Sequence, residues 1–228
     1  MYNSKIIIAL DFPDREKTFQ FLNSFQGEKL FVKIGMELLY KEGLSIISEI
    51  KARGHQIFLD LKLYDIPNTV SSAIHSLGLL GVDLLTVHAS GGLEMLKAAQ
   101  KAAQEYSLNL LAVTVLTSQE VHELPKTDYS LNEIIYDLAQ KSVEAKMFGI
   151  ICSAKDIPYL KEFKDQLQFI TPGIRLLSDD KNDQKRVTSP DQAIQNGANF
   201  LVIGRTITQS LETYQTYKKI QDLIGEKS

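Results

Sequence analysis

Three charged residues, Asp60, Lys62 and Asp65, lie within six positions of the segment DLKLYDIPNT, residues 60–69. The apolar run 56–59 precedes them and predicts that they lie at the exit of a β-strand. Alternate side chains of a strand project to the same side, so Asp60 and Lys62 share a face about 7 Å apart, while Asp65 lies in the following loop. An ammonium between carboxylates can stabilise a developing anion and protonate it. A solvated ion-pair network is the alternative interpretation.

Polar residues also occur at or after the ends of most other apolar runs. Lys33 is the most informative of them, because it interrupts the run LFVKIG and an unpaired buried ammonium is costly. In a parallel barrel such strand ends gather at one face and carry the functional residues. Each residue alone could equally be a turn or cap residue, but their recurrence predicts one site. The residues at these ends are Asp11, Lys33, Asp60, Lys62, His88, Thr117, Ser118, Arg175, Gly204 and Arg205.

Two glycine-containing segments near the end of the chain have the features of a phosphate site. They are TPGIR at 171–175 and IGRT at 203–206, and they follow the last two expected strands, where barrels often bind phosphate. Glycine lets the main chain approach a ligand closely, and Arg205 can add a forked contact. Between them, the polar segment 176–188 is long enough to be a mobile lid, or else it is an ordinary solvated loop.

Strands and helices must alternate along the chain to position these residues. We expect strands over 5–10, 30–35, 56–59 with its continuation to Lys62, 84–89, 108–116, 149–153, 169–174 and 200–203. We expect helices over 15–25, 38–53, 70–80, 93–106, 131–145, from the sixth strand through 163, over 193–196 and over 208–224.

Strands this apolar are covered on both faces, which indicates a parallel sheet. Eight strand-helix repeats predict a single α/β domain over residues 1–228, a (β/α)8 TIM barrel of nearly minimal length. Two ordinary domains or a doubly wound open sheet are the alternatives. Against the open sheet, the chain has no G-x-G-x-x-G after its first strand and no G-x-x-x-x-G-K-[ST] motif.

Composition and motifs exclude several classes of protein. A net charge of -3 provides no broad basic face for nucleic acid or an anionic membrane, and the apolar runs are too short to span a bilayer. We therefore expect a cytoplasmic protein. The single cysteine, Cys152, is expected to be a buried apolar residue. Neither a metal site nor a nucleophilic hydrolase is indicated, because the four histidines form no i,i+4 pair and no G-x-S-x-G is present.

These motifs, taken together and in order, resemble the orotidine 5′-phosphate decarboxylase family in its compact bacterial form. The resemblance covers the whole chain, and its most specific part is 60–69, because related sugar-phosphate enzymes share D-x-K-x-x-D but not the following I-P-N-T. It implies a homodimer that converts orotidine 5′-phosphate to UMP and CO₂ without a cofactor, in the last step of de novo pyrimidine biosynthesis. The matching segments are ALDF at 9–12, VKIG at 32–35, DLKLYDIPNT at 60–69, VTVLTS at 113–118, TPGIR at 171–175 and VIGRTIT at 202–208.

The resemblance also implies a role for each matching residue. Lys62 would protonate C6 of the pyrimidine, within a charged array of Lys33, Asp60, Lys62 and an Asp65 that the other subunit provides. The substrate would be bound by Asp11 and Lys33 at the ribose with Thr69 of the partner, by Asp60, by Thr117 and Ser118 at the pyrimidine, and by Pro172, Arg175, Gln184, Gly204 and Arg205 around the phosphate.

Two other functions fit the same residues less well. A metal-dependent sugar-phosphate decarboxylase or aldolase on the same barrel would require added Mg²⁺. A phosphate-binding sensor without catalysis would bind UMP without turnover, and it would not need Lys62 between two carboxylates.

Overall fold

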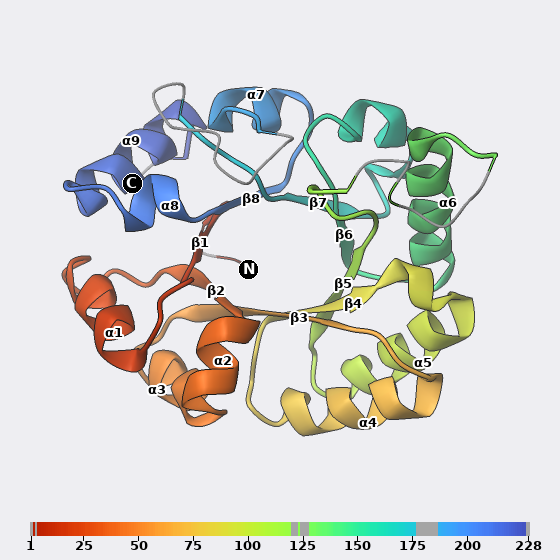
Figure 1. Ribbon diagram of the computed structural model, residues 1–228, viewed down its shortest axis with the longest axis horizontal. Helices are drawn as coiled ribbons and strands as arrows, with labels where there is room; N and C mark the ends of the chain where they lie inside the picture. The colour runs from red at the N-terminus through yellow and green to blue at the C-terminus, as the bar shows by residue number, and fades with distance from the viewer. Residues whose placement is uncertain (1, 3, 120–122, 124–127, 177–186, 227–228) are drawn as a thin grey trace.

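The computed structural model of the chain contains a closed barrel of eight parallel strands in sequence order (Figure 1). It describes all residues except 1, 3, 120–122, 124–127, 177–186 and 227–228. The first strand pairs with the last, which closes the barrel, so the predicted TIM barrel is confirmed and the doubly wound open sheet is wrong. The strands are β1 Ile6–Ala9, β2 Phe31–Gly35, β3 Gln56–Leu63, β4 Leu84–His88, β5 Asn109–Val113, β6 Gly149–Ile151, β7 Gln168–Thr171 and β8 Phe200–Ile203.

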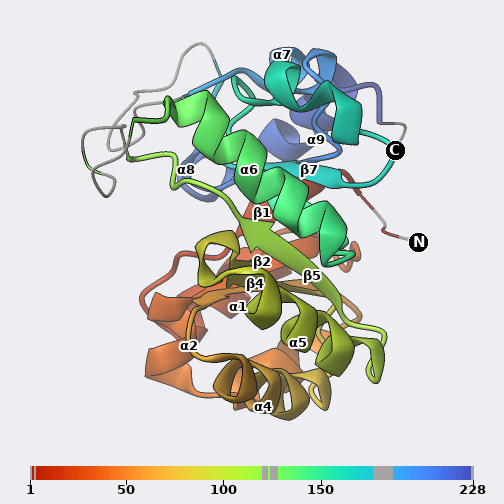
Figure 2. The ribbon, with the colours of Figure 1, turned by 90° about the vertical axis from the view of Figure 1, so that its right-hand side faces the viewer.

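Helices surround the barrel and connect consecutive strands (Figures 1 and 2). Local sequence sets where several of them begin: Asp14 caps the first helix by accepting a hydrogen bond from Lys17 N, and Pro67 occupies the first turn of the fourth. The helices are α1 Arg15–Asn23, α2 Met36–Glu42, α3 Ser45–Ala52, α4 Pro67–Gly78, α5 Leu93–Gln104, α6 Leu131–Glu144, α7 Pro190–Gln195, α8 Arg205–Thr208 and α9 Thr213–Leu223, with 3-10 turns at Ala89–Gly91 and Ile157–Phe163.

Four expected elements differ most from the structure, whereas β7 ends at Thr171, before the expected 174, and α7 begins at Pro190, before the expected 193. The helix expected over 38–53 is two helices, α2 and α3, because Gly43 adopts a φ of 72° between them. The helix expected over 208–224 is also interrupted, at a turn where Ser210 Oγ accepts a hydrogen bond from Glu212 N and so competes with helical pairing. The helix expected to end at 163 is a 3-10 helix, and the fifth strand ends at Val113 because both neighbouring strands end beside it.

Two apolar layers fill the molecule, one between the strands and the helices and one inside the barrel. Alternation along each strand separates them: Ile6 and Ile8 face the helices, whereas Ile7 and Ala9 face the barrel interior. Tyr2 stacks on Phe31 inside the barrel with 5.1 Å between ring centroids. The interior layer consists of Ile7, Ala9, Phe31, Phe58, Leu84, Leu111, Ile170, Phe200 and Val202.

The structure also bears on the cysteine and on membrane-spanning segments. Cys152 is fully buried in the apolar layer beneath the helices, as expected. Among the described residues, no helix is both long enough and apolar enough to cross a membrane.

Candidate functional site

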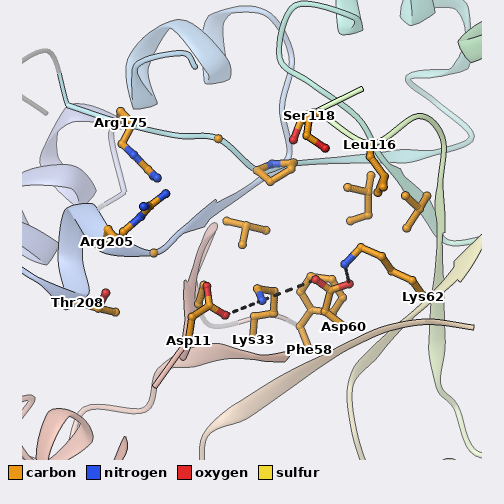
Figure 3. Close-up of a pocket in the computed structure, with 18 of the residues that line it drawn as sticks. Asp11, Lys33, Phe58, Asp60, Lys62, Leu116, Ser118, Arg175, Arg205 and Thr208 are labelled. Carbon is orange, nitrogen blue, oxygen red and sulfur yellow. Dashed lines mark hydrogen bonds and ion pairs between the residues drawn. The ribbon is translucent and has the colours of Figure 1, made fainter. Parts of the chain in front are cut away.

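A cavity of about 740 Å³ opens at the carboxyl ends of the strands (Figure 3). Its apolar floor includes Phe58 of the interior layer, and its polar wall comes from strand ends that are far apart in the sequence. The structure therefore gathers most of the predicted site residues in one place, as the barrel geometry requires. The predicted residues that line the cavity are Asp11, Lys33, Asp60, Lys62, Thr117, Ser118, Pro172, Arg175, Gly204 and Arg205.

Four of these side chains form a row of alternating charge along one wall (Figure 3). Lys62 Nζ lies 2.8 Å from Asp60 Oδ1, and Lys33 Nζ lies 3.7 Å from Asp60 Oδ2 and 3.1 Å from Asp11 Oδ1. The Asp60 side chain is only 14% exposed, whereas that of Asp11 is 60% exposed. The centre of the row is thus withdrawn from water, which contradicts the alternative of a solvated ion-pair network.

The surroundings of Asp60 keep its carboxylate ionised. Burial alone would raise the pKa of Asp60, but the positive charges of Lys33 and Lys62 and hydrogen bonds from Lys62 and Thr86 hold that pKa below its usual value. His88, at the end of β4, is kept uncharged instead. Burial and the nearby Lys62 ammonium lower the pKa of His88, so its imidazole is neutral at pH 7.

Two arginines form the opposite side of the cavity. Figure 3 shows Arg175 and Arg205 together on one side and Lys62 on the other. Arg175 is 9% exposed, and its Nη1 donates a 2.8 Å hydrogen bond to Ile174 O. Its main chain is fixed too, because Arg175 N donates to Thr188 O at 3.1 Å across a parallel bridge. A molecule with an anionic group at one end would bridge the arginines and the charged row.

Of the predicted residues that the structure describes, His88, Asp65 and Thr69 do not line the cavity of this chain. Asp65 is exposed in the segment that joins β3 to α4, and Thr69 is exposed in the first turn of α4. Asp65 Oδ1 accepts a hydrogen bond from the main-chain N–H of Ile66. Gln184 lies outside the described residues, as does most of the expected lid, 177–186.

Sequence reasoning missed two residues that shape the charged row. Thr86 of β4 is fully buried, and its hydroxyl contacts both Asp60 and the main chain of Lys62. A polar residue inside the apolar run LLTVH was the available signal. Gly35 leaves space beside the row, because a Cβ at this position would lie 3.2 Å from Lys33 Nζ and 3.5 Å from Asp11 Oδ1.

No group of three or more potential metal ligands occurs among the residues that the structure describes.

Further residues that the sequence did not indicate lie along the cavity wall. Phe12, Lys17, Thr208 and Gln209 are polar or aromatic lining residues that follow β1 and β8. Phe12 and Thr208 belong to the matching segments 9–12 and 202–208, but no role was predicted for any of these four residues.

Comparison with known proteins gives a consistent result. Residues 4–220 match the family model described as orotidine 5′-phosphate decarboxylase / HUMPS family. The chain is 46% identical to the orotidine 5′-phosphate decarboxylase of Bacillus cytotoxicus and 45% identical to that of Bacillus cereus strain AH187, in each case over 95% of this chain and 97% of the relative.

Solved structures with the same fold include two close matches. A chain of orotidine 5′-phosphate decarboxylase from Lactobacillus acidophilus matches with a TM-score of 0.85 and 31% identity, over 96% of this chain and 98% of that one. An uncharacterized conserved protein from Geobacillus kaustophilus matches with a TM-score of 0.85 and 35% identity, over 96% and 99% of the two chains.

Proposed function

The chain belongs to the orotidine 5′-phosphate decarboxylase / HUMPS family, and on that premise we propose that it converts orotidine 5′-phosphate to UMP and CO₂. This reaction is the last step of de novo pyrimidine biosynthesis. The observation that carries the proposal is a cavity with two arginines on one side and an ammonium held between carboxylates on the other. The substrate has the matching form, with a phosphate at one end and a carboxylated ring at the other.

Lys62 is the proposed proton donor. Cleavage of the bond between C6 and the carboxylate releases CO₂ and leaves an electron pair on C6, with no adjacent carbonyl to delocalise it. A fixed ammonium beside C6 stabilises this localised charge and then protonates the carbon, after which solvent restores the proton on Lys62. Asp60 holds the ammonium at 2.8 Å, and its own charge lies beside the departing carboxylate. No cofactor enters this mechanism.

The other site residues are proposed to bind the rest of the substrate. Asp11 and Lys33 lie 3.1 Å apart on the wall between the two ends of the cavity, which suits the ribose hydroxyl groups. Thr117 and Ser118 are assigned to the pyrimidine. The phosphate is assigned to the main-chain N–H of Gly204, to the side chains of Arg175 and Arg205, and to Gln184, with Pro172 at the border of that pocket.

A homodimer with shared sites is the second part of the proposal. Asp65 and Thr69 are exposed and lie off the cavity wall of their own chain, so a second chain could bring them to the charged row. The same segment carries large exposed apolar side chains: Tyr64 is 63% exposed and Ile66 is 66% exposed. Burial of such side chains stabilises association. In the dimer, Asp65 of one chain would face Lys62 of the other.

The proposal treats residues 1–228 as one catalytic domain that acts in the cytoplasm. A single cooperative unfolding transition in calorimetry would support the first point, and cell fractionation would test the second.

The activity is tested by following the loss of orotidine 5′-phosphate absorbance with purified protein after exhaustive chelation. We expect full activity without any added metal. A rate that collapses on chelation and returns with Mg²⁺ would favour a metal-dependent sugar-phosphate enzyme instead. Tight binding of UMP with no turnover would favour a sensor.

A further inference from the structure

The strand that carries the charged row is irregular where the row begins. Leu59 of β3 is paired with Leu85 of β4, and Leu63 is paired with Val87, so four steps along β3 correspond to two along β4. The two extra residues form a bulge. Within it, Lys62 adopts a φ of 53°, a left-handed conformation that residues with a side chain adopt only at a cost in free energy. Something must hold Lys62 in this conformation.

The Thr86 hydroxyl replaces the regular strand pairing at the bulge. Lys62 N donates a 2.8 Å hydrogen bond to Thr86 Oγ1, and Thr86 Oγ1 donates a 3.0 Å hydrogen bond to Asp60 Oδ1. The same Asp60 oxygen accepts a hydrogen bond from Lys62 Nζ at 2.8 Å. The directions are unambiguous, because a main-chain N–H can only donate and an ionised carboxylate can only accept. The hydroxyl thus completes a closed ring of hydrogen bonds through both ends of Lys62.

The position of Thr86 gives this ring a rigid base. Leu84 faces the barrel interior whereas Leu85 and Val87 face the helices, so Thr86 also points inward by strand alternation. It is fully buried, and its strand is paired on both sides with β3 and β5. A fully buried hydroxyl with fixed partners has no water to exchange with, so it holds its two partners at fixed distances.

We propose that Thr86 is a positioning residue of the decarboxylation: its hydroxyl fixes the left-handed main chain of Lys62 and the rotamer of Asp60, and thereby aims the Lys62 ammonium at C6. This inference rests on the proposed function. Thr86 does not line the cavity and acts only through Asp60 and Lys62. A hydroxyl that served folding alone would affect stability but not the turnover of the folded protein.

The test compares Thr86→Val, which removes the hydroxyl at nearly constant volume, with Thr86→Ser, which keeps it. Thr86→Val loses the hydrogen bond that Thr86 Oγ1 donates to Asp60 and the one that it accepts from Lys62 N. We expect this loss to lower kcat about 10- to 100-fold. Affinity for UMP should change less than about threefold, because the arginines are untouched. Thr86→Ser should keep most of the wild-type kcat. If Thr86→Val does not fold, Thr86→Ala removes the same hydroxyl without adding a methyl group against Asp60.

A matched control is available on a helix. Thr18 of α1 is also fully buried, does not line the cavity, and its hydroxyl donates a 2.8 Å hydrogen bond to Asp14 O. Thr18→Val makes the same chemical change and should leave kcat within about twofold of wild type, since the lost hydrogen bond does not reach the charged row.

The outcomes separate this inference from the proposed function. A hydroxyl-free variant with wild-type kcat, or a Thr86→Ser variant as impaired as Thr86→Val, overturns the positioning role and leaves the decarboxylase standing. A wild-type protein that does not turn over orotidine 5′-phosphate overturns the proposed function. In that case a crystal structure of Thr86→Val still decides the geometry: Lys62 leaves the left-handed region if the hydroxyl holds it, and an unchanged φ and an unchanged contact between Lys62 and Asp60 refute the role.

Discussion

Substitution of Lys62 by alanine is the most direct test of the mechanism, because it removes the ammonium and leaves the arginine side of the cavity intact. The Lys62 side chain is 27% exposed to solvent, so an effective dielectric constant of about 20 is appropriate for its interactions. At 4 Å, one unit charge then stabilises an adjacent carbanion by about 4 kcal/mol, which corresponds to about 10³ in rate. Loss of the proton donor adds a factor of about 10² to 10⁴.

Turnover of Lys62→Ala is therefore expected to fall by at least about 10³-fold, measured as loss of substrate absorbance at saturation. Affinity for UMP, measured by calorimetry, should stay within about tenfold, because UMP has no charge at C6 that needs the ammonium. Lys141→Ala is the matched control, since it removes one positive charge from an exposed pair with Asp137 on α6. A Lys62→Ala enzyme within tenfold of wild-type kcat would refute the assigned role of Lys62.

Three further predictions concern the subunits, the charged row and the phosphate. Inactive Lys62→Ala and Asp65→Ala chains that are refolded together should regain activity at about a quarter of all sites. At random pairing about half of the dimers are mixed, and a twofold mixed dimer has one site with both lesions and one with neither. A mixture as inactive as its parents would show that Asp65 serves the site of its own chain. The lowered pKa of Asp60 contributes stability that is present above its unfolded value of about 4 and is lost as the pH falls towards the folded value. Urea unfolding of Asp60→Asn should therefore show a smaller loss of stability below about pH 4 than wild type. Equal acid sensitivity of the two proteins would contradict this. Arg205→Lys should weaken UMP binding by about 10- to 100-fold in calorimetry through loss of the forked contact, with no change in affinity for uridine; an equal loss for uridine would place Arg205 away from the phosphate.

Much of the fold was predictable from the sequence because strand-helix units repeat eight times and each strand is apolar enough to be covered on both faces. The location of the site followed from that pattern, since a parallel barrel brings all strand ends to one face. Lys33 illustrates the reasoning: an ammonium in an apolar run required a polar partner, and the structure supplies Asp11 at 3.1 Å.

Helix boundaries were less predictable, because short interruptions depend on single residues. The break at Gly43 and the side-chain hydrogen bond of Ser210 each end a helix that apolar spacing alone would have continued. Hydrophobic periodicity indicates which face of a segment is buried, but not whether one helix or two provide that face.

The two-residue spacing of Asp60 and Lys62 predicted that both side chains lie on the same side of the strand, but it did not predict the contact between them. In a regular strand these positions are about 7 Å apart along the main chain. In this structure a bulge and a left-handed main chain at Lys62 set the direction of its side chain, and the ammonium lies 2.8 Å from the carboxylate. That geometry depends on Thr86, 24 residues from Lys62, so no local pattern around Asp60 could reveal it. The same carboxylate also lies near Lys33 on β2. A D-x-K motif alone does not predict this arrangement, because an ammonium fixed at both its main chain and its side chain requires Thr86 of β4 beside Asp60 of β3, and the barrel brings these two strands together.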